Sequence, residues 1–465
     1  MPCPHAGGGR ADDTAPSDDP DASRREFMKA AVAIGGAAAL SACLSRSPEA
    51  DLSTTPDGQP TANPIETQRF AQGTDSLDDL PERQHEWGKY VQVDSYGNPD
   101  FPHHQAFLLL DYLGEETPTQ AERTRVEQAF RTLERAFKRG VGSDQRAVMN
   151  DGLLFTVGYS PSYFDRFEEP LPDSVDIMPP EALLERLGED PANATTCDAA
   201  IHLASDLAPV VLAAEEALFG RLEHVNGVEV QGSLAGVFEP VERRTGFVGS
   251  GFPKERLRDD IPARAPVSMG FKSNYRDTFP SEDKITITEG PFAGGSVQQL
   301  SKLRNHLDEW YDQDHEQRVE KMFSPEHSSE TVGDVGENLA SKSEITREIA
   351  DRTVEDARTK GRVGHGQKLA RVRDDDDEPL IMRRGDFNAT AESGAILHFG
   401  SLQRGIDEFV KTRDAMNEVD LDGTGDAPDL PDSENGILDF IEVLSRSTYL
   451  VPPRRYRSLP TPRPS

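Results

Sequence analysis

Cysteine is almost absent from this chain of 465 residues, which contains only Cys3, Cys43 and Cys197. The first two lie in or at the edge of an N-terminal segment that has the features of an export signal. Cys197 alone can form neither a disulfide framework nor a cysteine-ligated metal site. The sequence therefore excludes a fold that depends on disulfides and a zinc centre built from thiolates.

Positive charge is also scarce, because 50 basic residues stand against 83 acidic ones and the net charge is -33. No basic stripe is present, so binding to a nucleic acid backbone is excluded. The acidic residues are spread through the whole chain, as in proteins adapted to high salt, where screening makes such self-repulsion tolerable. An ordinary acidic exported protein is the alternative interpretation.

Common catalytic motifs are missing as well. The sequence has no Ser/His/Asp elbow, no phosphate-binding Walker loop, no His-Glu-x-x-His and no paired cysteines. A hydrolase or a nucleotide enzyme therefore has no support. The hydrophobic content of 35% and the 21 phenylalanines favour a globular protein with a sizeable core.

The N-terminus predicts export. Ser23-Arg-Arg-Glu-Phe-Met-Lys29 and the short apolar run Ala30–Ala42 are typical of a twin-arginine signal, and the run is too short to span a membrane. Because Leu40-Ser-Ala-Cys43 resembles a lipoprotein cleavage site, Cys43 is predicted to be lipidated after residues 1–42 are removed; a plain cleaved signal is the alternative. Residues 43–80 then form a flexible spacer, which would hold the protein at the extracellular face of the membrane.

Hydrophobic periodicity predicts an α+β fold made of two ferredoxin-like domains, residues 81–255 and 256–465. In the first domain we expect strands at 106–110 and 153–159 and a helix at 120–138. In the second we expect a strand from Gly294-Gly295-Ser296, helices at 304–312 and 406–416, a polar insertion of solvated loops at 324–362, and strands at 380–384 and 395–399. The domain junction is expected between Pro253 and Pro266.

Several segments of the chain follow one another in a distinctive order. His365 lies eighteen positions before Arg383 of Met382-Arg-Arg-Gly385, and the strand Gly394-Ala-Ile-Leu-His-Phe-Gly400 comes next. Gly270-Phe-Lys272 and Thr156-Val-Gly-Tyr-Ser-Pro-Ser-Tyr-Phe-Asp-Arg-Phe167 precede them. Together these segments resemble the haem-binding framework of the dye-decolorizing (DyP-type) peroxidases over roughly residues 85–455, and the composition resembles that of an exported haloarchaeal member. The resemblance implies two linked ferredoxin-like domains with antiparallel sheets, and haem b in the second.

The resemblance also implies roles for single residues. His365 would be the axial ligand of the haem iron, and Asp439 would accept a hydrogen bond from its second ring nitrogen. Arg383 would stabilise the charge that develops as the peroxide O–O bond breaks, with a structural ion pair as the alternative. Arg304 would meet a haem propionate or remain a solvated surface residue. Trp310 and Tyr311, taken as surface residues, could relay electrons.

The chain departs from the family at the residue that performs acid–base chemistry. The family reads Gly-Phe-Lys-Asp-Gly, whereas this chain reads Gly270-Phe-Lys-Ser273-Asn274. A serine hydroxyl is too weak an acid to replace a carboxylate as proton shuttle. Arg383 with an ordered water, or Asp277, could take over the proton transfer, or the chemistry could have changed.

Three functions remain open at this point. The first is an exported haem peroxidase that uses hydrogen peroxide to oxidise organic reductants in single-electron steps. The second is a haem-binding or haem-handling lipoprotein without turnover, and the third is a surface protein without haem. Contact with a membrane is expected only through the lipid anchor, and association of copies of this chain is a further expectation. The segment Asp420–Asp426 only partly resembles a calcium loop, since Pro431 occupies the place of the closing Glu.

Overall fold

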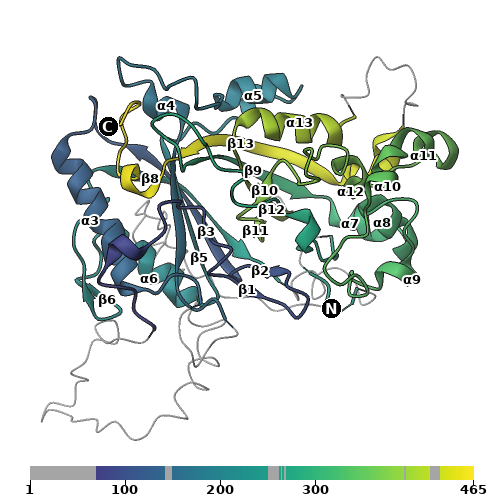
Figure 1. Cartoon of the computed structure of the whole chain (residues 1–465), viewed down its shortest axis with the longest axis horizontal. Coiled ribbons are helices and arrows are strands. Elements are labelled where there is room, and N and C mark those ends of the chain that lie inside the picture. The colour runs from purple at the N-terminus through teal and green to yellow at the C-terminus, as the bar shows by residue number, and fades with distance from the viewer. Residues whose placement is uncertain are drawn as a thin grey trace, which may run out of the picture. The chain divides into compact units, whose positions relative to one another are not determined.

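A nine-stranded antiparallel sheet organises the part of the chain that the computed structural model describes (Figure 1). The described residues are 70–141, 149–249, 261–262, 264–266, 269–391, 394–418 and 430–464, all within the unit Pro64–Ser465. The predicted signal, Cys43 and Asp420–Asp426 lie outside them. The strands are β3 (His104–Tyr112), β4 (Leu154–Tyr159), β5 (Ala199–Ser205), β8 (Phe238–Phe247), β9 (Ser296–Asn305), β10 (Met382–Arg383), β11 (Phe387–Ala391), β12 (Gly394–Gln403) and β13 (Ile441–Val451).

Helices connect these strands, and several of them pack on the sheet. They are α3 (Gln120–Ala136), α4 (Pro161–Phe164), α5 (Pro180–Arg186), α6 (Ala208–Leu218), α7 (Leu307–Asp312), α8 (His315–Met322), α9 (Ser329–Val332), α10 (Arg347–Asp351), α11 (Thr353–Lys360), α12 (His365–Leu369) and α13 (Ile406–Met416). Two short hairpins, β1 (Gln92–Val93) with β2 (Pro99–Asp100) and β6 (His224–Val225) with β7 (Val228–Glu229), lie outside the main sheet. None of the described helices combines the length and hydropathy that a membrane span needs.

The strand order contains the ferredoxin-like pattern twice, which confirms the predicted fold class. In the first unit the chain runs β3, α3, β4, β5, α6, β8, and the strands lie side by side as β8-β3-β5-β4. In the second unit the sequence β9, β11, β12, α13, β13 gives the equivalent order β13-β9-β12-β11, with the segment from α7 to α12 in place of the first helix. Single residue pairs, Leu450 with Tyr159 and Asn388 with Phe247, join the two units.

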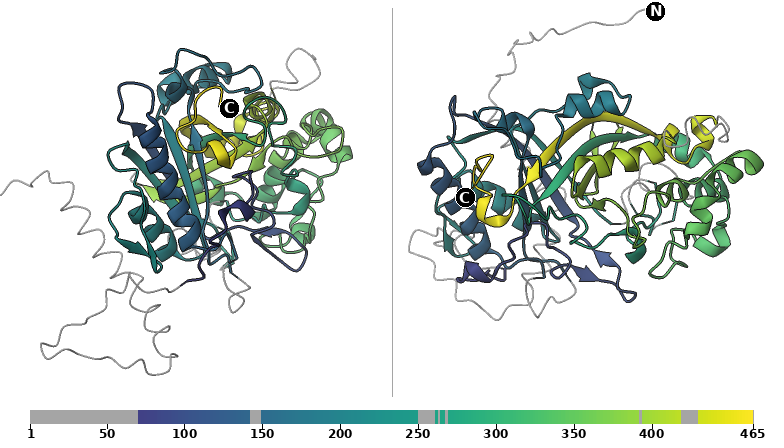
Figure 2. Two further views of the ribbon diagram at one scale, coloured as in Figure 1. Left: turned by 60° about the vertical axis from the view of Figure 1, so that its left-hand side comes forward. Right: turned by 45° about the horizontal axis from the view of Figure 1, so that its top comes forward.

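Because β9 pairs with both β12 and β13, the sheet closes on itself. The long strands β9 and β13 pair along their length, and the yellow β13 can be followed beside β9 in the right-hand view of Figure 2. Side chains alternate between the two faces of a strand, so one set points into the ring and the other points out toward the helices. The inner set includes Phe107, Leu300, Phe387 and Tyr449, which belong to one buried cluster.

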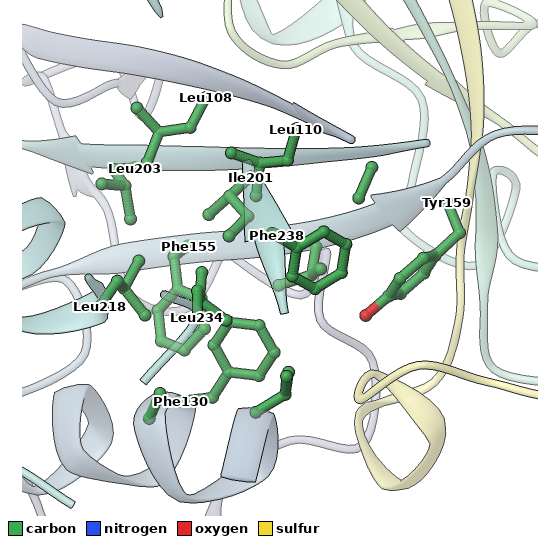
Figure 3. Close-up of a cluster of buried hydrophobic side chains, with 14 of the residues drawn as sticks. Leu108, Leu110, Phe130, Phe155, Tyr159, Ile201, Leu203, Leu218, Leu234 and Phe238 are labelled. Carbon is green, nitrogen blue, oxygen red and sulfur yellow. The ribbon is translucent and has the colours of Figure 1, made fainter. Parts of the chain in front are cut away.

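The outer face of the first unit carries the largest core. Leu108 and Leu110 of β3 pack with Ile201 of β5 and Phe130 of α3 in one buried cluster (Figure 3). Helix α3 begins with a capping box, in which the Thr119 hydroxyl accepts a hydrogen bond from the Glu122 amide. Its apolar residues recur at helical spacing and therefore face the sheet.

Most predicted elements of the first unit and helix 406–416 are confirmed, but three expectations are wrong. Arg304 and Asn305 continue β9, and the helix begins only at Leu307, because pairing with strands on both sides outweighs local helix propensity. The polar insertion contains α9, α10 and α11, and Ser328 and Thr346 cap two of these helices. Residues 70–80 do not behave as a spacer, since Phe70 packs on the core and Leu77 is buried. The domain junction falls mostly outside the described residues and stays a prediction.

Candidate functional site

His365 opens the short helix α12, which is fixed by close backbone contacts. Gly364 precedes the helix, and a side chain at Gly364 would collide with the carbonyl of Phe323 at the end of α8. The Gln367 amide donates to the same carbonyl at 3.0 Å, and Val363 forms a bridge with Asn435. These contacts hold the backbone on both sides of His365 in place.

The His365 imidazole is buried and has one ring nitrogen without a hydrogen-bond partner. Its Nδ1 is buried and has no hydrogen-bond partner. Burial, together with smaller contributions from the cations Lys368, Arg383 and Arg413, lowers the pKa of His365 to about 3. A metal-binding imidazole has to be unprotonated, and buried ring nitrogens without partners are uncommon in proteins. These properties are compatible with a metal ligand, and His85, His202 and His398 share them, so the sequence context of His365 is what selects it.

Arg383 reaches this region from β10. Met382 pairs with Leu402 on the inner face of the sheet, so Arg383, opposite Ser401, points to the outer face. Its guanidinium donates to the Ser273 carbonyl and, at 3.4 Å, to the Thr278 hydroxyl. The guanidinium also lies 5.0 Å from the ring centre of Phe279. These contacts fix a cation close enough to His365 to affect its pKa.

The segment with Ser273 therefore lies beside Arg383, as the resemblance implies. The contact is made by the backbone of Ser273 and not by its hydroxyl. Phe271, two residues earlier, packs edge-on against Phe323 with ring centres 5.6 Å apart. Lys272 forms an ion pair of 2.9 Å with Asp94. The structure thus brings the Gly-Phe-Lys-Ser segment, β10 and α12 together from distant parts of the sequence.

In the structure, the Asp277 carboxylate is bound to Ser343. Both of its carboxylate oxygens accept the Ser343 amide at 3.0 Å, and one accepts the Ser343 hydroxyl at 2.9 Å. Its backbone carbonyl accepts a hydrogen bond from Arg373. The carboxylate therefore anchors the loop before α10, and a move toward Arg383 would break these bonds.

Asp386 is a carboxylate that sequence reasoning missed. It is the last of the residues 384–386, which interrupt the strand between β10 and β11. Its Oδ2 lies 3.7 Å from Nη1 of Arg383. Burial raises the pKa of Asp386 and lowers that of Arg383, and each charge opposes the shift of the other. Yet the two side chains keep 30% and 22% of their surface exposed. Solvent therefore reaches both side chains.

The backbone conformation at Gly385 explains the position of Asp386. Gly385 has a φ of +93°, and a Cβ there would come within 2.5 Å of Phe107 Cζ inside the ring. A glycine that interrupts a strand marks a change in side-chain direction. The acidic residue directly after it is thereby returned to the outer face, the side on which Arg383 lies.

The other predicted site residues lie elsewhere. Arg304 forms an ion pair of 2.5 Å with Glu442 at the end of the sheet, in agreement with the surface alternative. Asp439, in a 3-10 turn, is exposed and forms no bond with His365, because the turn directs it to solvent. The predicted hydrogen bond is therefore wrong. Trp310 and Tyr311 were expected at the surface but are buried at 0% and 3% exposure, so that expectation is also wrong.

The described residues offer few other candidate sites. They contain no group of three or more His, Cys, Asp or Glu that could hold a metal ion. Burial raises the pKa of the Cys197 thiol to about 12, so this cysteine is an inert thiol in the sheet core. A pocket of about 420 Å³ is lined by Tyr90, Glu134 and Arg139 among others, and none of the predicted site residues lines it.

Solved structures of similar proteins include DyP-type peroxidases. The encapsulated DyP-type peroxidase from Mycobacterium smegmatis is 16% identical, with a TM-score of 0.46, and the match covers 78% of this chain and 97% of that one. A haem-bound variant of DypB from Rhodococcus jostii RHA1 is 14% identical, with a TM-score of 0.47 and coverage of 77% and 96%. A dye-decolorizing peroxidase from Bacteroides thetaiotaomicron is 13% identical, with a TM-score of 0.43 and coverage of 80% and 98%.

Among curated proteins, none matches the chain. A family model, described as a family of unknown function (DUF7405), matches residues 102–453. This range spans the sheet from β3 to β13 and includes His365, Arg383 and Asp386. The chain therefore belongs to the DUF7405 family.

Proposed function

We propose that this protein binds haem b through His365 and uses hydrogen peroxide to oxidise organic reductants in single-electron steps. The observation that carries the proposal is that a buried imidazole on α12 with an unpartnered Nδ1 lies within electrostatic reach of a guanidinium held in place on β10. A haem site needs one nitrogen ligand on one side and, for peroxide cleavage, a cation on the other. The sequence resemblance to DyP-type peroxidases points to the same two residues.

His365 and Arg383 would have different roles in this reaction. When bound, haem would supply the iron and the redox chemistry. His365 would hold it with a lone pair that its low pKa keeps free of protons. Arg383, already oriented by Ser273, Thr278 and Phe279, would stabilise negative charge on the leaving oxygen of the peroxide. We propose haem b, because covalent attachment of a c-type haem uses a Cys-x-x-Cys-His motif that the sequence lacks.

Haem binding is tested with the purified protein after haem is supplied. We expect a Soret band that is lost in His365→Ala. His224→Ala is the matched control, because His224 lies on β6 in the first unit and its Nδ1 is likewise buried without a partner. A colourless wild-type protein, or a band that survives in His365→Ala, would contradict the proposal.

Peroxide chemistry is tested separately, because a haem-binding protein without turnover is the second candidate. The serine at position 273 favours this candidate, since the resemblance expects a carboxylate there. We expect Arg383→Leu to keep the Soret band and to react with peroxide about 10²- to 10³-fold more slowly, the cost typical of losing one charge-stabilising donor. Arg304→Leu serves as control because Arg304 pairs with Glu442. A Soret band without any peroxide-dependent oxidation in wild type would favour the second candidate.

We also propose that the protein is exported by the twin-arginine route and anchored at the extracellular face by a lipid on Cys43. Support comes from Ser23–Lys29, the apolar run that follows, and the Leu-Ser-Ala-Cys sequence. Replacing Arg24 and Arg25 by lysine should keep the protein inside the cell. Cys43→Ser should instead release it into the medium, and unchanged membrane fractionation of this variant would contradict the anchor. Association of copies stays a prediction that size-exclusion chromatography can test.

A further inference from the structure

We infer that Asp386 transfers the proton during peroxide cleavage, in the place of the carboxylate that the resemblance expects at Ser273. This inference rests on the proposed function and adds the missing acid–base group to it. It starts from the contact between Asp386 and Arg383, whose nearest charged atoms lie 3.7 Å apart. The charge of Arg383 also contributes to the low pKa of His365, so Arg383 lies within electrostatic reach of that residue.

The backbone around Asp386 explains how a carboxylate comes to this place. Strand β12 pairs first with β10 and then with β11, and the residues between them form an interruption. Arg384 turns away from Arg383: it is buried, and its guanidinium lies 5.1 Å from the ring centre of Trp87. Gly385 takes a positive φ that other residues rarely adopt. Asp386 thereby comes to the same side as Arg383, and Phe387 again points into the ring.

The surroundings of Asp386 suit a group that both accepts and returns a proton. Burial raises the pKa of its carboxyl from the ordinary 3.8, and Arg383 is the charged residue among the described ones that lowers it. Its side chain nevertheless remains 30% exposed, so a small molecule can reach it. A carboxyl group whose pKa lies nearer the working pH is a better acid–base catalyst than an ordinary one.

Two other candidates for this role are less suitable. The Ser273 hydroxyl is too weak an acid, and only its backbone carbonyl meets Arg383. The Asp277 carboxylate is occupied by three hydrogen bonds from Ser343. Asp386 forms no comparable bonds: apart from Arg383 at 3.7 Å, no partner among the described residues is recorded for its carboxylate.

The proton balance of the step is simple. The Asp386 carboxylate would accept a proton from one oxygen of hydrogen peroxide. It would then return this proton to the other oxygen, which would leave as water when the O–O bond breaks. When bound, haem would supply the two electrons for this cleavage, and two single-electron reductants with two protons would restore it and release the remaining oxygen atom as a second water. Asp386 ends in the ionisation state in which it began.

The test compares Asp386→Asn with wild type after both have been loaded with haem. We expect an unchanged Soret band and a peroxide reaction about 10²- to 10⁴-fold slower, the usual contribution of acid–base help. A second readout does not depend on turnover: hydrogen cyanide must lose a proton when it binds ferric haem, so cyanide binding should slow in the same variant. Asp308→Asn, which changes an exposed acidic residue on α7, is the matched control and should change neither rate.

A rescue variant separates a chemical role from a structural one. Adding Ser273→Asp to Asp386→Asn should make the peroxide reaction at least about tenfold faster than in Asp386→Asn alone. The reason is that the Gly-Phe-Lys-Asp segment would again place a carboxyl beside Arg383. Equal peroxide and cyanide rates in wild type and Asp386→Asn would overturn the role of Asp386 and leave the proposed function intact. A lost Soret band in Asp386→Asn that Ser273→Asp does not restore would assign Asp386 a structural role and overturn the inference. A wild-type protein without a Soret band would overturn both.

Discussion

Glu134 offers a quantitative test of how the C-terminal segment is attached. The carboxylate lies on α3 with 7% of its side chain exposed, and it pairs with Arg454 at 2.8 Å and with Arg457 at 2.5 Å. Burial alone would raise the pKa of Glu134, but the two guanidinium groups outweigh it and lower the pKa to about 2. Arg457 itself is almost fully buried, at 2% exposure of its side chain. The pair thus joins the first helix to the end of the chain.

The lowered pKa gives the size and the pH dependence of the expected effect. A shift from 4.5 to about 2 corresponds to about 3 kcal/mol of folding free energy at neutral pH. Since the pKa is lower in the folded than in the unfolded protein, this contribution is complete above about pH 5 and is lost as the pH falls toward 2. We expect Glu134→Gln to lower the free energy of unfolding by about 3 kcal/mol at pH 7, and by less than about half of that at pH 3.

Urea denaturation at fixed ionic strength, followed by tryptophan fluorescence, measures this difference. Glu185→Gln is the control, because Glu185 is an exposed helical residue for which no ion pair is recorded, and it should change stability by less than about 0.5 kcal/mol. A loss in Glu134→Gln no greater than in this control would refute the reasoning. So would a loss that is undiminished at pH 3, since it would then arise from packing and not from the ion pair.

Further predictions concern local structure. Thr119→Ala should cost about 1 kcal/mol in the same denaturation assay, because it removes the capping box of α3, and an unchanged midpoint would contradict this. Gly385→Ala should cost more than about 1 kcal/mol, because it combines a positive φ with a Cβ 2.5 Å from Phe107, and a stable variant would show that the strand interruption adapts. The Asp206 carboxylate raises the pKa of His103. The stabilisation that protonated His103 gains from Asp206 should therefore be present below pH 6.5 and be lost as the pH rises through the higher pKa. His103→Gln should abolish this pH dependence of the free energy of unfolding.

The sequence predicted the candidate site in part. His365 and Arg383 could be selected because they stand in segments with a recognisable order, and the structure brings these segments together with Ser273. Asp439 and Arg304 were placed by analogy with a family pattern, and the structure sends one to solvent and the other to Glu442. Whether a polar side chain meets its partner depends on turns and strand ends, whose direction sequence periodicity does not specify.

Asp386 also shows that the sequence pattern does not specify the contacts of a polar side chain. No motif distinguishes it from the other 82 acidic residues of the chain, and only its contact with Arg383 makes it a candidate. That contact depends on the interruption between β10 and β11 and on the positive φ of Gly385. A glycine after two arginines is compatible with many turns, so the sequence alone could not select this one.

Local features were determined by the sequence itself. The helices Ile406–Met416 and α3 and the strands β3 and β4 follow from hydrophobic spacing, which acts over a few residues. The closing of the sheet through β9, the junctions at Tyr159 and Phe247, and the meeting of α12 with β10 were decided by the tertiary structure. The physical reason is that strand pairing and ion pairs join residues far apart in the chain, and their free energy depends on the geometry of the whole fold.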